Sequence, residues 1–115
     1  MADSIAFAVT NLAANAVVVA DVDIANSRFN PPDRTRKISL YVVINLANGV
    51  RFTSGVAGTD HVSDVPGFFD TNLALSTRDN LLGSYYALPN QRFFVGYREM
   101  TGVATTDIQG LLILE

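Results

Sequence analysis

The amino-acid sequence predicts an all-β protein, built as an antiparallel β-sandwich, a jelly roll or a small barrel with at most one short helix. β-branched residues are abundant, with 13 Val and 9 Thr, whereas strong helix formers for an exposed surface are scarce, with 2 Glu, 1 Lys and 2 Gln. Nine Asn, nine Asp and eight Gly supply the residues that turns require. A length of 115 residues fits one domain, residues 1–115, with a single hydrophobic core.

The strongest local pattern lies in residues 37–54 and predicts a β-hairpin that turns at Asn48-Gly49. Every even position of its first strand is aliphatic: Ile38, Leu40, Val42, Ile44 and Leu46. A two-residue type I′ turn would place Arg51 on this aliphatic face. A three-residue turn over 47–49, with Gly49 in the left-handed conformation, instead pairs Leu46 with Val50 and Ile44 with Phe52. Because a slip of one residue moves every side chain to the other face, we favour the three-residue turn.

The remaining elements follow in chain order from the same alternation and from turn residues. Residues 1–12 predict a strand or an extended arm, 12–16 a helical turn, 16–24 a strand, and 25–36 a loop that contains Pro31-Pro32. Residues 55–70, with Gly55 and Gly58, predict the longest irregular stretch, and 71–82 fit either a short helix or a strand with a turn. Strands are expected at 83–88, 91–100 and 111–114, with a loop or weak strand over 101–110.

The composition favours a non-enzymatic structural protein that assembles with copies of itself. Only 17% of the residues are charged, 49% are hydrophobic, and seven of the eight basic residues are Arg, the cation that suits interfaces. The second face of the expected hairpin is mixed, which is typical of a surface that meets another subunit; its residues are Tyr41, Val43, Asn45, Arg51 and Thr53. The apolar segments 1–12 and 111–115 add Phe7 and Leu112 as candidates for subunit contacts. We expect a capsid, decoration or tail component of a virion, or another repeating surface subunit.

A ligand-binding module, most simply for carbohydrate, is the alternative function. Its candidate residues are His61, Asp64 and Phe68 in the 55–70 loop, together with Tyr85 and Tyr86. Long structured loops often carry binding residues, and exposed aromatic rings form platforms for ligands. Strand alternation within Phe68-Phe69 and within Tyr85-Tyr86 sends one ring inward and the other outward, so we favour a core ring and an interface ring in each pair.

Motifs for catalysis, for a metal or for a cofactor are missing from the sequence. The chain has no Cys and one His, which excludes the usual zinc sites and a thiol nucleophile. His61 has Asp60 and Ser63 close in sequence, but a catalytic triad needs groups that converge from separate parts of a fold. The acidic residues do not show the spacing of a calcium loop, and the glycines do not match a phosphate-binding loop. We therefore expect no metal and no cofactor.

Partners other than protein subunits are disfavoured by the charge pattern. The net charge is −3, which argues against nucleic acid even though Arg28, Arg34, Arg36 and Lys37 cluster in and beside the 25–36 loop. Apolar runs stay shorter than the ~18 residues that span a membrane, and residues 1–12 lack the basic start of a secretory signal. The expected partner is the protein itself or another structural protein.

Overall fold

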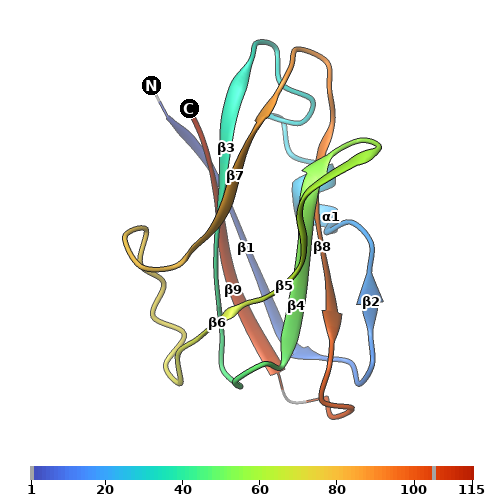
Figure 1. Ribbon diagram of the computed structural model, residues 1–115, viewed down its shortest axis with the longest axis vertical. Helices are drawn as coiled ribbons and strands as arrows, with labels where there is room; N and C mark the ends of the chain where they lie inside the picture. Colours follow the sequence, from blue (N-terminus) through green and yellow to red (C-terminus); the bar gives the residue numbers. More distant parts are fainter. Residues whose placement is uncertain (1, 105) are drawn as a thin grey trace.

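Two β-sheets face each other across a hydrophobic core in the computed structural model, which describes residues 2–104 and 106–115 (Figure 1). Sheet A contains β1 (Asp3–Leu12), β9 (Thr106–Leu114), β3 (Arg36–Ile44), β7 (Leu81–Ala87) and the two-residue β6 (Phe68–Phe69). Sheet B contains β2 (Val17–Val18), β8 (Phe93–Glu99), β4 (Val50–Val56) and β5 (Thr59–Pro66). In the described part of the chain the single helix is α1 (Val22–Ala25). The predicted class, an all-β sandwich with at most one short helix, is confirmed.

The strand order and the contacts between the sheets define how the sandwich is closed. Sheet A runs β1-β9-β3, with β7 and β6 both beside β3, and sheet B runs β2-β8-β4-β5. The sheets approach closely where β5 lies beside β7, because a Cβ at Gly83 would lie 2.5 Å from the side chain of Val62. The helix α1 contacts both β1 and β8, and its Ile24 is fully buried in the core. The helix therefore fills the space between the sheets beside β1.

The predicted β-hairpin over residues 37–54 is wrong, because its two strands lie in different sheets. β3 belongs to sheet A and β4 to sheet B, so the segment between them crosses from one sheet to the other, and β3 pairs with β9 and β7 instead. Asn48, and not Gly49, is in the left-handed region with a φ of 58°. The amide of Gly49 donates to the carbonyl of Leu46 at 3.0 Å, and the Leu46 side chain is 39% exposed.

The alternation nevertheless identified the buried face of both strands. The even-numbered aliphatic side chains of β3, from Ile38 to Ile44, and Val50 and Phe52 of β4 have no exposed surface. Strands in two facing sheets share one core without pairing with each other. Alternation reports which face of a strand is buried, whereas the pairing partner depends on contacts distant in the sequence.

Residues 55–66 form the turn and second strand of a β-hairpin whose register shifts between Phe52 and Gly55, and the predicted irregular loop is wrong. β4 continues through Gly55 to Val56, and β5 returns with Thr59 opposite Val56 after a two-residue turn. Gly58 in this turn has a φ of 85°, which glycine adopts without strain. A Cβ at Gly55 would lie 2.1 Å from the carbonyl oxygen of Thr59, so this glycine permits a close approach between strands and does not mark a loop.

Three further boundaries differ from the expected ones. Only β2 is a strand within residues 16–24, because the side chain of Asp21 accepts the amides of Asp23 and Ile24 at 3.0 and 3.4 Å and starts α1. Residues 71–80 contain turns and no helix, which leaves β7 to begin at Leu81. The predicted strand at 111–114 is the second half of the longer strand β9. Among the described residues, no helix is long and apolar enough to cross a membrane.

Glu99 holds together the loops at one end of sheet B. Its carboxylate accepts the amides of Asn15, Thr101 and Gly102 at 3.2, 2.7 and 2.6 Å, and the hydroxyl of Thr101 at 2.5 Å. The residue is 4% exposed. Burial acts to raise the pKa of Glu99, but the hydrogen bonds from Thr101, Asn15 and Gly102 together outweigh it and lower the pKa to about 2. The carboxylate is therefore ionised throughout the ordinary pH range.

Candidate interaction surface

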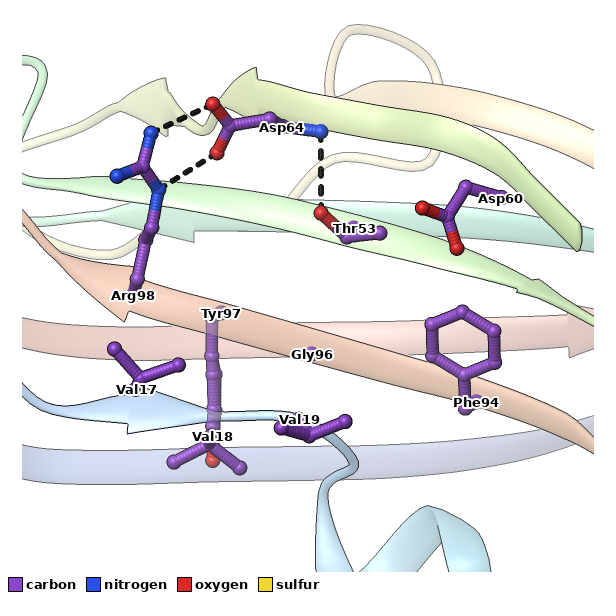
Figure 2. Close-up of a pocket in the computed structure, with 10 residues that line it drawn as sticks. All are labelled: Val17, Val18, Val19, Thr53, Asp60, Asp64, Phe94, Gly96, Tyr97 and Arg98. Atoms are coloured by element: carbon purple, nitrogen blue, oxygen red, sulfur yellow. Dashed lines mark hydrogen bonds and ion pairs between the residues drawn. The ribbon is translucent and has the colours of Figure 1, made fainter. Parts of the chain in front are cut away.

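The outer face of sheet B carries a hollow of about 280 Å³, here called the sheet B groove (Figure 2). Its sides and floor come from Val17, Val19, Gly96, Thr53 and Asp60, and its two ends from Phe94 and from the pair Arg98–Asp64. These residues lie on or beside β2, β8, β4 and β5, so segments far apart in the sequence build one surface.

Gly96 determines the shape of the groove floor. A Cβ at this position would lie 2.5 Å from the carbonyl oxygen of Val19 and 2.8 Å from that of Val18. The backbone of residues 17–19 therefore packs directly against β8, which only glycine allows at this distance. As a result, the side chains of Val17 and Val19 stand beside the groove while the floor stays low (Figure 2).

An ion pair closes one end of the groove. Arg98 donates to both carboxylate oxygens of Asp64, from Nε at 2.8 Å and from Nη2 at 2.6 Å. Arg51 lies beside them, with its Nε 3.3 Å from the carboxylate and with two hydrogen bonds to the Asp64 carbonyl, at 3.0 and 2.6 Å. The Arg98 hydrogen bond is the main reason that the pKa of Asp64 is lowered, against a smaller desolvation effect. The Asp64 carboxylate is therefore paired at this end of the groove, within a cluster of two cations and one anion.

The β2 side of the groove is apolar and exposed. Val17 is 70% exposed and Val19 79%, and Val22, the first residue of α1, is 67% exposed. We call these three residues the valine patch. A further apolar side chain, Phe94, is half-buried at one end of the groove. Apolar side chains surrounded by charged or polar ones are typical of protein interfaces, where an apolar centre is enclosed by a polar rim.

A second mixed surface lies on the outward side of sheet A. Tyr41 of β3 lies between Leu111 of β9 and Leu81 of β7, and it is half-buried. Leu81 is 44% exposed and Tyr86, further along β7, is 63% exposed. Leu111, Tyr41 and Leu81 form an apolar strip across sheet A, separate from the sheet B groove, and Tyr86 lies several residues away along β7.

Comparisons with known proteins leave the chain without an assigned family. No protein-family model and no curated protein sequence matches it. One similar solved structure, described as "Acidic stable capsid structure of Helicobacter pylori bacteriophage KHP30", shares 14% identity at a TM-score of 0.44, covering 100% of this chain and 88% of that one. Another, "Bacillus endospore appendages form a novel family of disulfide-linked pili", shares 13% identity at a TM-score of 0.39, covering 99% of this chain and 85% of that one. Likenesses of this size do not assign a function.

The interface residues expected from the sequence separate into surface and core positions. Arg51 and Thr53 lie at the sheet B groove, and Tyr41 lies on the outward side of sheet A. Asn45 accepts the amide of Asp107 at 2.9 Å and so joins the end of β3 to β9. The side chains buried within this chain are Val43, Phe7 and Leu112, which are 0%, 3% and 0% exposed. These three contact a second copy only if strands are exchanged, and the subunit contacts themselves remain predictions.

The ligand residues expected from the sequence do not meet at one place. His61 stacks on Tyr85 with centroids 5.2 Å apart, and Tyr85 is 4% exposed. Asp64 lies in the ion pair of the groove. Phe68 lies on β6 beside Val43, and Tyr86 points outward from sheet A. The alternation within Tyr85-Tyr86 is as predicted, with one ring inward and one outward, whereas Phe68 and Phe69 are both exposed, at 38% and 53%.

Sequence reasoning did not select Phe94, Gly96 and Arg98 of β8 as surface candidates, nor Val17 and Val19 beside them. The three β8 residues alternate along the strand predicted at 91–100, opposite the buried Phe93, Val95 and Tyr97, so their outward direction follows from the pattern. The sequence carried no signal that β2 would lie beside them. Within the described residues, no group of three or more His, Cys, Asp or Glu side chains is placed to hold a metal ion.

Proposed function

We propose that this protein is a non-enzymatic structural subunit that assembles with copies of itself, such as a capsid, decoration or tail component of a virion or another repeating surface subunit. The valine patch supports the proposal most directly. Val17 and Val19 are exposed beside the groove, and Val22 is exposed a few residues further along the chain. A surface of this kind gains free energy when a second protein surface covers it.

Covering the valine patch contributes favourably to association. Complete burial of one Val side chain contributes about 1.5 to 3 kcal/mol. The patch exposes most of Val17, Val19 and Val22, and the half-buried Phe94 in the groove adds to the apolar area. The low charge of the chain, 19 charged residues in 115, offers little repulsion between copies.

The test is the oligomeric state of the unmodified protein and of a patch variant. Mass photometry at low concentration and light scattering at higher concentration should show oligomers of the unmodified protein. Val19→Asp should weaken association at least tenfold, because assembly would then bury an unpaired carboxylate. The matched control is Val103→Asp, an exposed valine outside the groove, 47% exposed, which should leave association unchanged.

Two outcomes would contradict the proposal. The unmodified protein could stay a monomer across the whole concentration range, which would remove the self-assembling function. Alternatively, Val19→Asp and Val103→Asp could reduce association equally, which would show a general effect of charge and no role of the valine patch. Circular dichroism spectra of all three proteins should coincide, because both valines are exposed in the folded chain.

A specific feature of the groove favours a second function, the binding of a small polar ligand such as a sugar. The Phe94 ring lies across the groove from Asp60 (Figure 2), and no described residue forms a hydrogen bond or an ion pair with the Asp60 carboxylate. A sugar ring could stack on Phe94 while its hydroxyl groups donate to Asp60. Binding on a glycan array that is lost in Phe94→Ala and kept in Val103→Asp would support this function, and an array without binding would exclude it for the glycans tested.

A further inference from the structure

β1 lies at one edge of sheet A (Figure 1). Its residues pair with β9, from Asp3 opposite Leu114 to Val9 opposite Ile108, and no other strand in the described part of the chain pairs with it. The pairing is regular over Asp3–Val9, and a register shift follows before Leu12. One side of a regular seven-residue strand therefore has no backbone partner among the described residues.

Over residues 3–9 this edge lacks most of the features that prevent pairing with another chain, although the register shift follows Val9 and α1 contacts β1. Edge strands are usually protected by lysine, proline, an inward charge, a bulge or a covering segment. Residues 3–9 contain no lysine, proline or bulge, and the outward side chains Ser4, Ala6 and Ala8 are small, uncharged and exposed. The single charge, Asp3, is bound by the buried Arg36 at 2.8 Å at the start of the strand. The edge is therefore suited to strand addition.

We propose that β1 pairs with β1 of a second copy, antiparallel about a twofold axis, so that the two A sheets join into one continuous sheet. The proposal rests on the self-assembling function proposed above and identifies one of its contacts. Pairing over the whole regular stretch, 3–9, places its central residue, Ala6, opposite the partner's Ala6. Ser4 then lies opposite the partner's Ala8.

Charge and side-chain direction both favour a second copy in this register. The two Asp3 carboxylates lie at opposite ends of the paired strands, so like charges do not meet. Even-numbered residues meet even-numbered ones, which keeps Ser4, Ala6 and Ala8 on the outward side of both sheets. The core-facing residues Ile5 and Phe7 likewise meet on the inner side. A charged partner, in contrast, would find no complementary charge along 4–9.

Single cysteines test this pairing, because the chain has none of its own. Opposite residues in an antiparallel pair have Cβ atoms about 4.5 to 5.5 Å apart, within reach of a disulfide after a small adjustment. Ala6→Cys should form a disulfide dimer under mild oxidation on a non-reducing gel. A mixture of Ser4→Cys and Ala8→Cys should form the mixed dimer several-fold more than either protein forms a dimer alone.

Gln109→Cys is the matched control. Gln109 lies on β9, opposite Ala8 of β1, and points to the same outward side. It therefore lies one strand inside the edge of the sheet. It should form little disulfide dimer under the same conditions. Equal cross-linking of Gln109→Cys and Ala6→Cys would overturn the proposal, because random collision would then explain both.

Failure of this inference is distinguishable from failure of the proposed function. An unmodified protein that is oligomeric by mass photometry, with no disulfide in Ala6→Cys and none in the Ser4→Cys and Ala8→Cys mixture, would overturn the β1 contact and leave self-assembly intact. A monomeric unmodified protein would overturn both. Ala6→Lys gives a second measurement: repulsion between opposite lysines should break this contact, whereas Gln109→Lys should preserve it.

Discussion

Arg98 on β8 reaches across the intervening strand β4 to bind both carboxylate oxygens of Asp64 on β5, at 2.8 and 2.6 Å. The pair therefore joins two strands of sheet B that are not neighbours. Arg51, on β4 between them, completes a cluster of two cations and one anion. The side chains of Arg98 and Asp64 are 45% and 44% exposed, so water and salt weaken their attraction.

This exposure predicts that the ion pair contributes little to the stability of the single chain. Asp64→Asn and Arg98→Gln should leave the thermal melting temperature nearly unchanged, at low and at high salt. Asn suits position 64 because the backbone there is left-handed, with a φ of 53°, which Asn tolerates. A drop as large as that of the core substitution Phe52→Ala, a change that costs about 3 to 5 kcal/mol, would contradict the prediction.

Glu99 should make the protein sensitive to acid. Its pKa is about 2 in the folded chain, below the ordinary value of 4.5, so its hydrogen bonds stabilise the fold fully above pH 4.5. This stabilisation should be lost as the pH falls from 4.5 towards 2, because the unfolded chain takes up the proton first. Melting temperatures measured from pH 6 to pH 2 should fall more steeply for the unmodified protein than for Glu99→Gln. Parallel curves for the two proteins would contradict the assignment.

Sequence patterns predicted the buried faces of the fold better than its pairings. The alternation from Ile38 to Ile44 and at Val50 and Phe52 matches full burial, since a side chain's direction follows from the local period of a strand. The pairing of β3 with β4 was wrong because Asn-Gly is compatible both with a hairpin and with a crossing between sheets. Gly55 and Gly58 wrongly suggested an irregular loop for a related reason. Gly55 permits a close contact between two strands, and Gly58 permits a tight turn.

The candidate surface was predictable only in part. Alternation along 91–100 gives the outward direction of Phe94 and Arg98, and the mixed face of the expected hairpin gives Arg51 and Thr53. The groove itself depends on the backbone of Val18 and Val19 lying against Gly96, a contact between residues nearly eighty positions apart. Local patterns carry no information on such a contact.

Tyr41 and Val43 should respond differently to the same substitution, although both belong to the predicted interface set. Val43 has no exposed surface, so Val43→Asp buries a charge and should lower the free energy of unfolding by about 3 kcal/mol or more. Tyr41 is half-buried on the outward side of sheet A, and Tyr41→Asp should cost about 1 kcal/mol. Urea denaturation would measure both. Equal losses of unfolding free energy in the two variants would show that Tyr41 is also part of the core. Mass photometry of a folded Tyr41→Asp protein would show separately whether the substitution changes assembly.

Two buried tyrosine hydroxyls should differ in their contribution to stability. Tyr97 donates to the carboxylate of Asp21 at 2.7 Å, whereas the Tyr85 hydroxyl lies 2.7 Å from the hydroxyl of Ser54. Hydrogen bonds to a charged group contribute about 1.5 to 3 kcal/mol and neutral ones about 0.5 to 1.5 kcal/mol. Tyr97→Phe should therefore lower the free energy of unfolding more than Tyr85→Phe. Asp21 is also the N-cap of α1, so the loss of its partner Tyr97 should affect the start of this helix as well.

Alkaline titration provides an independent measurement on Tyr85. Burial raises its pKa to about 12, and the hydrogen bond with Ser54 counteracts this rise only in part. A folded-state pKa above the ordinary value of 10 means that neutral Tyr85 stabilises the fold below pH 10. This stabilisation should be lost as the pH rises from 10 to 12. The difference between the ultraviolet absorbance titrations of the unmodified protein and of Tyr85→Phe would isolate the ionisation of this side chain. A Tyr85 that ionises near pH 10 in the folded chain would contradict its burial where β7 lies beside β5.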